Sequence, residues 1–243
     1  MKKIVFILSM DLIATTCDSP CMAKQKKVTY KYNASSKTLT VSGKYLKGKL
    51  PSKTGGYNQA ARYKYQWSSL KGKAKKITLK KGVERIGHNA FGEFAKLNSV
   101  KFPNTLKKID AYAFGSTPIY YVYLPDSVKY IGESAFDMDG EERGIVKLKL
   151  SRNLKSIGKA AFRQNKIKEV VIPSNVEKIG AHAFVECNNL KKIVIKSKKL
   201  KKVGSRAFAD MGKDAVIYIP KERETEYRKM IEDSTAHAQI IAQ

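Results

Sequence analysis

Cysteine is scarce: the 243-residue sequence contains three, and two of them lie within the first 23 residues. That segment has the order of an export signal, because Lys2 and Lys3 precede an apolar run and small residues stand at its end. We expect residues 1–23 to be removed, which would leave Cys187 alone and exclude an intrachain disulfide. The alternatives are the frayed start of a cytosolic protein and, less favoured, a lipid anchor at Cys17, a poor match to a lipoprotein acceptor site.

Motifs of catalysis and of membrane insertion are also missing. His88, His182 and His237 lie far apart in the sequence and have no partnered nucleophile or shared ligand set. No phosphate-binding loop, dinucleotide fingerprint or carboxylate pair is visible, and no later apolar run is as long as a membrane span. We therefore expect a secreted or cell-surface protein that is not an enzyme and holds no cofactor.

Acidic residues are few: 21 Asp and Glu stand against 48 Lys and Arg, for a formal net charge of +27. Residues 24–83 contain 17 Lys or Arg and no acidic residue. A field of this sign attracts polyanions and accelerates their encounter with the protein. Nucleic-acid binding is the less favoured use of this charge, because the lysines are spread over the chain and form no recognised reading motif.

What the sequence does contain is a repeat. An aliphatic residue, Gly or Asp, two variable positions and Ala-Phe occur six times, as IGHNAF, IDAYAF, IGESAF, IGKAAF, IGAHAF and VGSRAF. The motif phenylalanines are Phe91, Phe114, Phe136, Phe162, Phe184 and Phe208. Their spacing of 22 to 26 residues is typical of stacked supersecondary units. The sequence therefore predicts a solenoid.

A short apolar alternation precedes each motif and predicts a strand. The alternating pairs are Ile77 and Leu79, Val100 and Phe102, Val122 and Leu124, Leu148 and Leu150, Val170 and Ile172, and Ile193 and Ile195. From the last strand residue to the motif phenylalanine there are 12 positions in five units and 13 in the sixth. We expect this stretch to be the buried frame, with the connections after each phenylalanine absorbing changes in length.

The segments at both ends of the chain are predicted to form caps. Alternation at Val28 to Tyr32 and at Leu39 to Val41, with turn residues between, predicts a hairpin, and we expect Trp67 to seal this segment onto the first repeat. After a final strand at Ile217 to Ile219, a polar helix should cover the last repeat. The expected division is a signal at 1–23, a basic β cap at 24–76, six to seven repeats at 77–220, and a helical cap and tail at 221–243.

These motifs carry a resemblance to a known family. The strands that end in proline (VKFP, VYLP, VVIP and IYIP), the IGxxAF signature and FxxCxxL at 184–190 resemble the BspA-like leucine-rich repeats of secreted and surface proteins. The hairpin, Trp67 and ITLKKGVERIG resemble the segment that often precedes such repeats. The likeness covers about residues 28–231 and implies a leucine-rich-repeat solenoid: a right-handed superhelix of short parallel strands with irregular or short-helical returns, an N-terminal β-hairpin cap and a C-terminal helical cap. It also implies an extracellular interaction protein, with adhesins among the relatives.

The outward positions of the stacked strands are the candidate binding surface. Side chains alternate along a strand, so the residues between the inward positions face solvent together. The candidate ligand-binding residues are Lys101, Tyr121, Tyr123, Lys147 and Lys149. An aromatic centre with a cationic rim would suit a protein, or an anionic surface polymer or glycan. The alternatives are that these are ordinary exposed strand residues and that the protein is a structural matrix component.

The densest acidity lies in the longest connection, Asp137 to Gly144. Asp137, Asp139 and Glu141 resemble part of a calcium loop, but a third early ligand and a bidentate Glu at the twelfth position are absent. We therefore expect a solvated loop and no metal, with a weak cation site at these three residues as the alternative.

Overall fold

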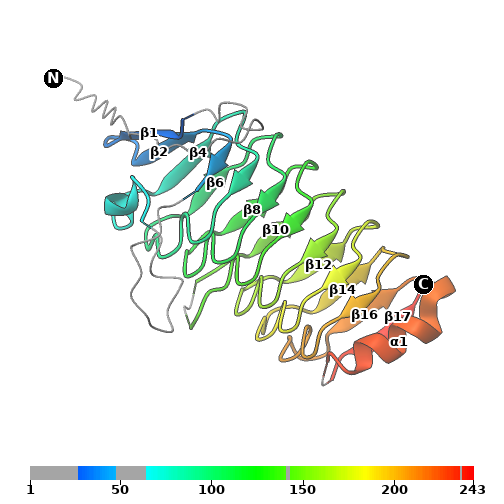
Figure 1. Cartoon of the computed structure of the whole chain (residues 1–243). Helices are drawn as coiled ribbons and strands as arrows, with labels where there is room; N and C mark the ends of the chain where they lie inside the picture. Colours follow the sequence, from blue (N-terminus) through cyan, green and yellow to red (C-terminus); the bar gives the residue numbers. More distant parts are fainter. Residues whose placement is uncertain (1–26, 48–63, 141–142, 236) are drawn as a thin grey trace, which may run out of the picture.

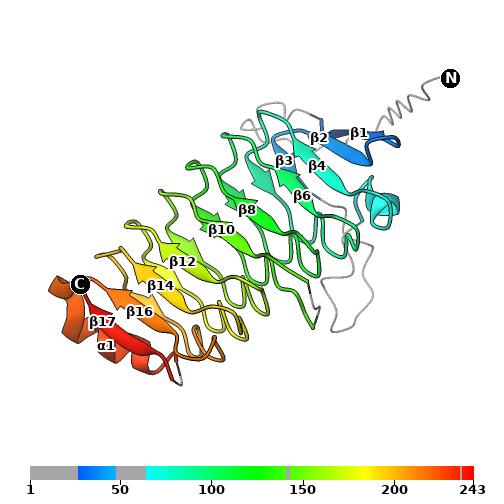
Figure 2. The same cartoon turned by 180° about the vertical axis from the view of Figure 1, so that it is seen from behind.

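The chain coils into a parallel β-solenoid of about seven turns in this computed structural model (Figures 1 and 2). The structure describes residues 27–47, 64–140, 143–235 and 237–243. The expected export signal, Cys17 and Glu141 therefore lie outside the described residues. Turns are stacked along one axis, with the hairpin at one end and the helix α1 at the other (Figure 1). The solenoid that the repeat predicts is confirmed.

One wall of the coil contains the predicted strands and, after them, one strand near the C-terminus that was not predicted. They are β1 (Thr29–Asn33), β2 (Thr38–Ser42), β4 (Lys76–Leu79), β6 (Ser99–Lys101), β8 (Tyr121–Tyr123), β10 (Lys147–Lys149), β12 (Glu169–Ile172), β14 (Lys192–Ile195), β16 (Val216–Ile219) and β17 (Gln239–Ala242). Hydrogen bonds join them in three groups, β1-β2-β4-β6, β8-β10 and β12-β14-β16-β17. The inward side chains of Ile77, Val122 and Val170 are at most 2% exposed, and those of Val100 and Leu148 are partly buried. Alternation thus places one face of this wall in the core.

A second wall is a seven-stranded parallel sheet that was not predicted from the sequence. Its strands have two residues each: β3 (Tyr45–Leu46), β5 (Arg85–Ile86), β7 (Lys108–Ile109), β9 (Tyr130–Ile131), β11 (Ser156–Ile157), β13 (Lys178–Ile179) and β15 (Lys202–Val203). The second residue of each strand from β5 onward is the aliphatic residue that opens the motif, and it points into the core. The residue before it faces outward. The returns are therefore less irregular than the resemblance implies.

The motif phenylalanines form a continuous stack through the core. Successive ring centroids from Phe91 to Phe208 lie 5.2 to 5.9 Å apart, and the rings are close to parallel. The backbone N–H of each of the first five phenylalanines donates to the next turn, as Phe91 does to the carbonyl oxygen of Ala113 at 2.8 Å, and that of Phe208 donates to the carbonyl oxygen of Ser234 in the C-terminal cap. All six rings are at most 2% exposed. The prediction that the motif marks a buried frame is confirmed.

Close approach of neighbouring turns explains the glycine at the second motif position. A Cβ added at Gly158 would lie 2.4 Å from the backbone of Gly132, and one at Gly204 would lie 2.2 Å from the backbone of Ala181. The second unit has Asp110 at this position, where the carboxylate accepts a hydrogen bond from Arg85 Nε at 2.7 Å. At its second position, the motif therefore has either glycine or an aspartate whose charge is paired with an arginine of the preceding turn.

The two caps cover the open ends of the core. β1 and β2 pair antiparallel, which confirms the hairpin, and β2 pairs parallel with β4. Trp67, next to the short 3-10 helix η2 (Ser68–Leu70), is 1% exposed. At the other end, η3 (Lys221–Arg223) leads into α1 (Glu224–Glu232), whose Tyr227 and Ile231 are buried. No helix in the described part of the chain is long and apolar enough to cross a membrane.

The strand expected at Ile217 to Ile219 is present as β16, but it is not the last strand of the chain. β17 follows α1 and pairs parallel with β16, with Ile217 opposite Ile240 and Tyr218 opposite Ile241. β17 provides hydrogen-bond partners for the N–H and C=O groups on the edge of β16, which would otherwise be unpaired. The last residues of the chain therefore extend the sheet and are part of the cap.

Candidate ligand-binding surface

Two neighbouring strands carry most of the candidate residues. β8 and β10 pair in parallel register, with Tyr121 opposite Lys147 and Tyr123 opposite Lys149. Val122, between the two tyrosines, is fully buried, so both tyrosines point outward, and their exposed fractions are 52% and 56%. Both lysines are also exposed. The structure thus brings four of the five predicted residues together.

The side chains of this surface contact one another. The rings of Tyr121 and Tyr123 are nearly parallel, with centroids 6.5 Å apart and an interplanar angle of 8°. The Nζ of Lys147 lies 6.0 Å from the centroid of the Tyr121 ring, at the outer limit of a cation–π contact. We call Tyr120, Tyr121, Tyr123, Lys147 and Lys149 the tyrosine patch.

Tyr120 belongs to the patch but is not among the residues predicted from the sequence. Its side chain is 43% exposed, and its ring centroid lies 6.4 Å from that of Tyr121. Strand alternation would turn it inward, but it precedes the first residue of β8, where strand geometry no longer applies. Its place in the sequence, directly before the predicted residue Tyr121, was the signal that could have identified it.

Lys101 lies apart from the patch in the hydrogen-bond pattern. It ends β6 and is exposed, but β6 pairs with β4 and has no ladder to β8. The first wall is interrupted at this point, so Lys101 has no registered partner among the tyrosines. Its place in a shared binding surface remains a prediction from the order of the turns.

The electrostatic environment beside the patch is positive. At the turn after β8, Asp126 accepts a hydrogen bond from Arg152 Nε at 2.7 Å. This hydrogen bond and the charges of Arg152 and Lys149 lower the pKa of Asp126. Asp126 is thus paired with Arg152. Lys147 and Lys149 form no ion pair with any of the described residues.

The acidic connection is less solvated than expected. Asp137 is 7% exposed and pairs with Arg163 Nε at 2.8 Å, while Nη2 of the same arginine lies 2.8 Å from Asp139. Glu141 lies outside the described residues. Because one guanidinium already occupies both carboxylates, a cation would have to displace it. Among the described residues, no group of three His, Cys, Asp or Glu side chains could hold a metal ion.

Neither Cys187 nor any of the three histidines lies in a reactive arrangement. Cys187 is buried and its thiol donates to the carbonyl oxygen of Phe162 at 3.2 Å. Burial raises the pKa of this thiol to about 12, which keeps it protonated and unreactive. His88 and His182 are half-buried at the motif turns, and His237 is exposed at the far end.

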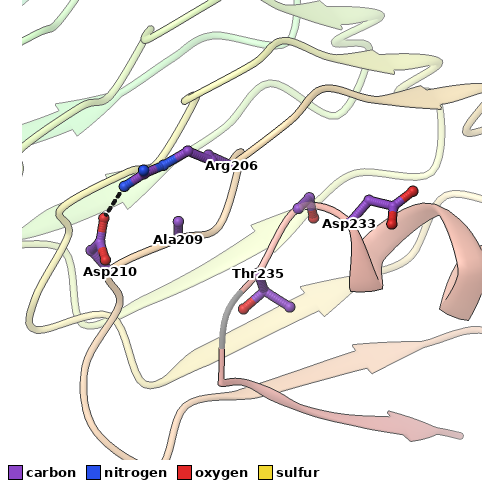
Figure 3. Close-up of a pocket in the computed structure, with 6 residues that line it drawn as sticks. Arg206, Ala209, Asp210, Asp233 and Thr235 are labelled. Carbon is purple, nitrogen blue, oxygen red and sulfur yellow. Dashed lines mark hydrogen bonds and ion pairs between the residues drawn. The ribbon is translucent and has the colours of Figure 1, made fainter.

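A small polar hollow lies where the C-terminal cap meets the last repeat (Figure 3). Its volume is about 260 Å³, and its lining includes Arg206, Asp210, Asp233 and Thr235. Arg206 and Asp210 pair with each other at 2.7 Å across one side. A hollow of this size, in which Arg206 and Asp210 already pair with each other, is smaller than a typical substrate pocket.

Comparison with known proteins agrees with this geometry. The model of the BspA type leucine rich repeat region, with six copies, matches residues 63–142 and 140–236. A leucine-rich repeat protein from Eubacterium ventriosum is similar in structure, with a TM-score of 0.59 and 17% identity over 81% of this chain. This chain spans 64% of that protein, which is less than two thirds of its length.

A second solved structure, the T. pallidum leucine-rich repeat protein, has a TM-score of 0.56 and 22% identity, over 92% of this chain and 100% of that one. At these identities the likeness concerns the fold. No curated protein matches the chain. Proteins with repeats of this type are bacterial surface or secreted proteins and typically non-enzymatic binding scaffolds, which indicates a protein-interaction module. The chain belongs to the BspA-type leucine-rich repeat family.

Proposed function

We propose that this chain is an exported, non-enzymatic binding module that captures a protein ligand through the tyrosine patch. The observation that carries the proposal is the pair of parallel, half-exposed rings of Tyr121 and Tyr123, in register with Lys147 and Lys149. Tyrosine is enriched at interfaces because it combines a large apolar area with few rotatable bonds and a polar tip. Lysines at the rim can match acidic groups of the partner and raise the rate of encounter.

The scaffold supports this use because it holds the patch rigidly. Val122 and Leu124 anchor β8 in the core, and the Leu124 N–H donates to the carbonyl oxygen of Lys149 at 3.0 Å. A backbone that is already fixed in this way loses little conformational entropy on binding, so more of the contact energy appears as affinity.

The test is a pull-down from an extracellular or cell-surface protein extract, with washes at low and high salt. Exposed charge interactions are screened over about 8 to 10 Å near physiological ionic strength, so ligands held by lysines alone should elute in high salt. A ligand of the patch should stay bound to the unaltered protein. Truncation of a central interface tyrosine costs on the order of 2 kcal/mol, or about 30-fold in Kd, so Tyr121→Ala with Tyr123→Ala should release it.

Tyr130→Ala is the matched control, because Tyr130 is also an exposed strand tyrosine, with an exposed fraction of 43%, but lies on the second wall. Tyr123→Ala with Lys149→Glu tests the aromatic and cationic parts together. Circular dichroism and melting should be unchanged in all three variants. Equal retention of the salt-resistant ligand by the patch variants and the control would refute the assignment.

Export and the division of the chain are parts of this proposal. Lys2, Lys3 and the apolar run after them support a signal that ends near Ala23. The cap, repeats and helical end would then form one mature unit with boundaries near 76 and 220. Mass spectrometry of the secreted protein measures the cleavage point, and an uncleaved chain retained in the cell would contradict export.

A further inference from the structure

A second surface, distinct from the tyrosine patch, follows the outer side of the second wall. The residue before each of its strands donates its N–H to the equivalent residue of the preceding turn. Lys129 donates to Lys107 at 2.8 Å, Lys155 to Lys129 at 2.9 Å, and Lys201 to Glu177 at 2.8 Å. The equivalent positions from the first to the last turn are Lys44, Glu84, Lys107, Lys129, Lys155, Glu177 and Lys201. They form one continuous file, in which five of the seven side chains are lysines.

A parallel file stands beside it, made of the first residue of each strand. Register pairs these residues in sequence: Tyr45 with Arg85, Arg85 with Lys108, Lys108 with Tyr130, Tyr130 with Ser156, Ser156 with Lys178, and Lys178 with Lys202. Each of these side chains points away from the core, since the next residue is the inward aliphatic one. We call the two files together the lysine row.

Acidic residues neutralise the two ends of the first file more than its middle. Glu84 lies 2.9 Å from the Nζ of Lys107 and 3.8 Å from that of Lys44, and Glu177 lies 3.4 Å from that of Lys201. Arg85 and Lys108, near the start of the second file, both pair with Asp110. Within the described ranges, no ion pair forms at Lys129 or Lys155 in the middle of the first file, or at Lys178 or Lys202 toward the end of the second, and all four lysines are exposed.

The dimensions of the row fit an extended single chain of repeating negative charge. Strands in a sheet lie about 4.7 to 4.9 Å apart, so the four steps from Lys107 to Lys201 span roughly 19 Å. A flexible linear polyanion can meet a cation at nearly every step. A DNA duplex cannot make contact at every step, because it is rigid and presents the same groove to one side only about every 34 Å.

Two other occupants fit less well. Proteins that bind single-stranded nucleic acid stack successive bases on aromatic side chains, and the central part of the row offers only Tyr130 among its described residues. A protein partner would need apolar anchors at the centre of the contact, where the row has charge. We therefore propose that the lysine row binds a linear anionic polysaccharide, independently of the tyrosine patch.

The experiment compares two triple variants with the same loss of charge. Lys129→Gln, Lys155→Gln and Lys178→Gln remove unpaired lysines of the row. Lys168→Gln, Lys191→Gln and Lys196→Gln remove three exposed lysines near the first wall and serve as the control. Because glutamine keeps much of the aliphatic stem, both variants should fold, which circular dichroism and thermal melting verify.

The probe is a sulfated oligosaccharide prepared from heparin, long enough to span the row, titrated at low and physiological salt. We expect the row variant to bind at least tenfold more weakly and with a shallower salt dependence, while the control loses less than threefold. In the unaltered protein, bound probe should protect Lys129, Lys155 and Lys178 from acetylation. Tyr121→Ala with Tyr123→Ala should bind the probe normally, so the row and the patch can fail separately.

Three results would overturn the proposal. Equal weakening in both triple variants would show that the probe senses only the overall charge. Acetylation that is unchanged by the probe at the three lysines would place the contact elsewhere. Duplex DNA of matched total charge that binds the row as tightly as the oligosaccharide, with the same loss in the row variant, would make the site one for nucleic acid.

Discussion

The indole Nε1–H of Trp67 donates a hydrogen bond to the carbonyl oxygen of Ala90 at 2.8 Å. The same ring stacks on Phe91, with centroids 5.4 Å apart and an interplanar angle of 18°. Trp67 therefore occupies the position that a motif phenylalanine of a preceding turn would have. The cap ends the solenoid by continuing its aromatic stack with a residue that also satisfies a backbone acceptor.

Replacing Trp67 by alanine should destabilise the N-terminal cap and the first repeat. Truncation of a buried tryptophan costs about 3 to 5 kcal/mol, and the carbonyl of Ala90 would lose its donor. Because repeats contact mainly their neighbours, the loss should be local. Urea unfolding measures the free energy, and limited proteolysis should detect early cleavage before Phe114.

The matched control for this change is Trp67→Phe, which keeps an aromatic ring but removes the indole donor. A buried acceptor left without its donor costs about 1 to 3 kcal/mol, so this variant should fall between the alanine variant and the unaltered protein. Stability equal to that of the unaltered protein would show that the hydrogen bond adds nothing to the cap.

Gly158→Ala should be strongly destabilising, because the new methyl group would lie 2.4 Å from the backbone of Gly132. Overpacking typically costs about 1 to 3 kcal/mol, and here the obstacle is backbone that cannot rotate away. Gly72→Ala is the control, since a Cβ there meets nothing within 4 Å, and its effect should stay within about 0.5 kcal/mol. Similar melting temperatures for the two variants would contradict the packing argument.

Much of the core could be predicted because the same physical constraint recurs six times. The phenylalanine and aliphatic positions of the motif must be buried for the turns to stack, so their spacing predicts both the strands and the frame. One structural requirement of the motif, at its fourth residue, could not be predicted from the sequence. The fourth residue looked variable, yet it has a positive φ in every copy: Asn89, Tyr112, Ser134, Ala160, His182 and Arg206. Backbone conformation there does not restrict the residue type enough to leave a pattern.

The candidate surface was only partly predictable, since outward side chains are not constrained by packing. Alternation placed Tyr121 and Tyr123 correctly on the exposed face, but it carried no information about the interruption between β6 and β8, which separates Lys101. The second wall was missed because strands of two residues are too short to show a period. Without that wall, the lysines at 129, 155 and 178 appeared scattered, although they are neighbours in space.

Acid should destabilise the protein partly through His88, which lies half-buried next to Tyr112, with ring centroids 5.4 Å apart. Burial lowers its pKa below the usual 6.5, and the charges of Asp110 and Glu133 oppose this only in part. The unfolded chain therefore binds a proton that the folded chain resists. The resulting stability is fully present above pH 6.5 and is lost as the pH falls through the folded pKa.

His88→Gln removes this proton-linked term and leaves the backbone carbonyl of residue 88 available to Tyr65, whose hydroxyl donates to it at 2.8 Å. Carboxylates that titrate near pH 4 act on both proteins alike, so the informative window runs from pH 7.5 to pH 5. Urea unfolding across this window should show a larger loss of stability for the unaltered protein than for the variant. Parallel curves would mean that His88 takes up its proton equally well in the folded and unfolded chain, which its burial among the motif turns argues against.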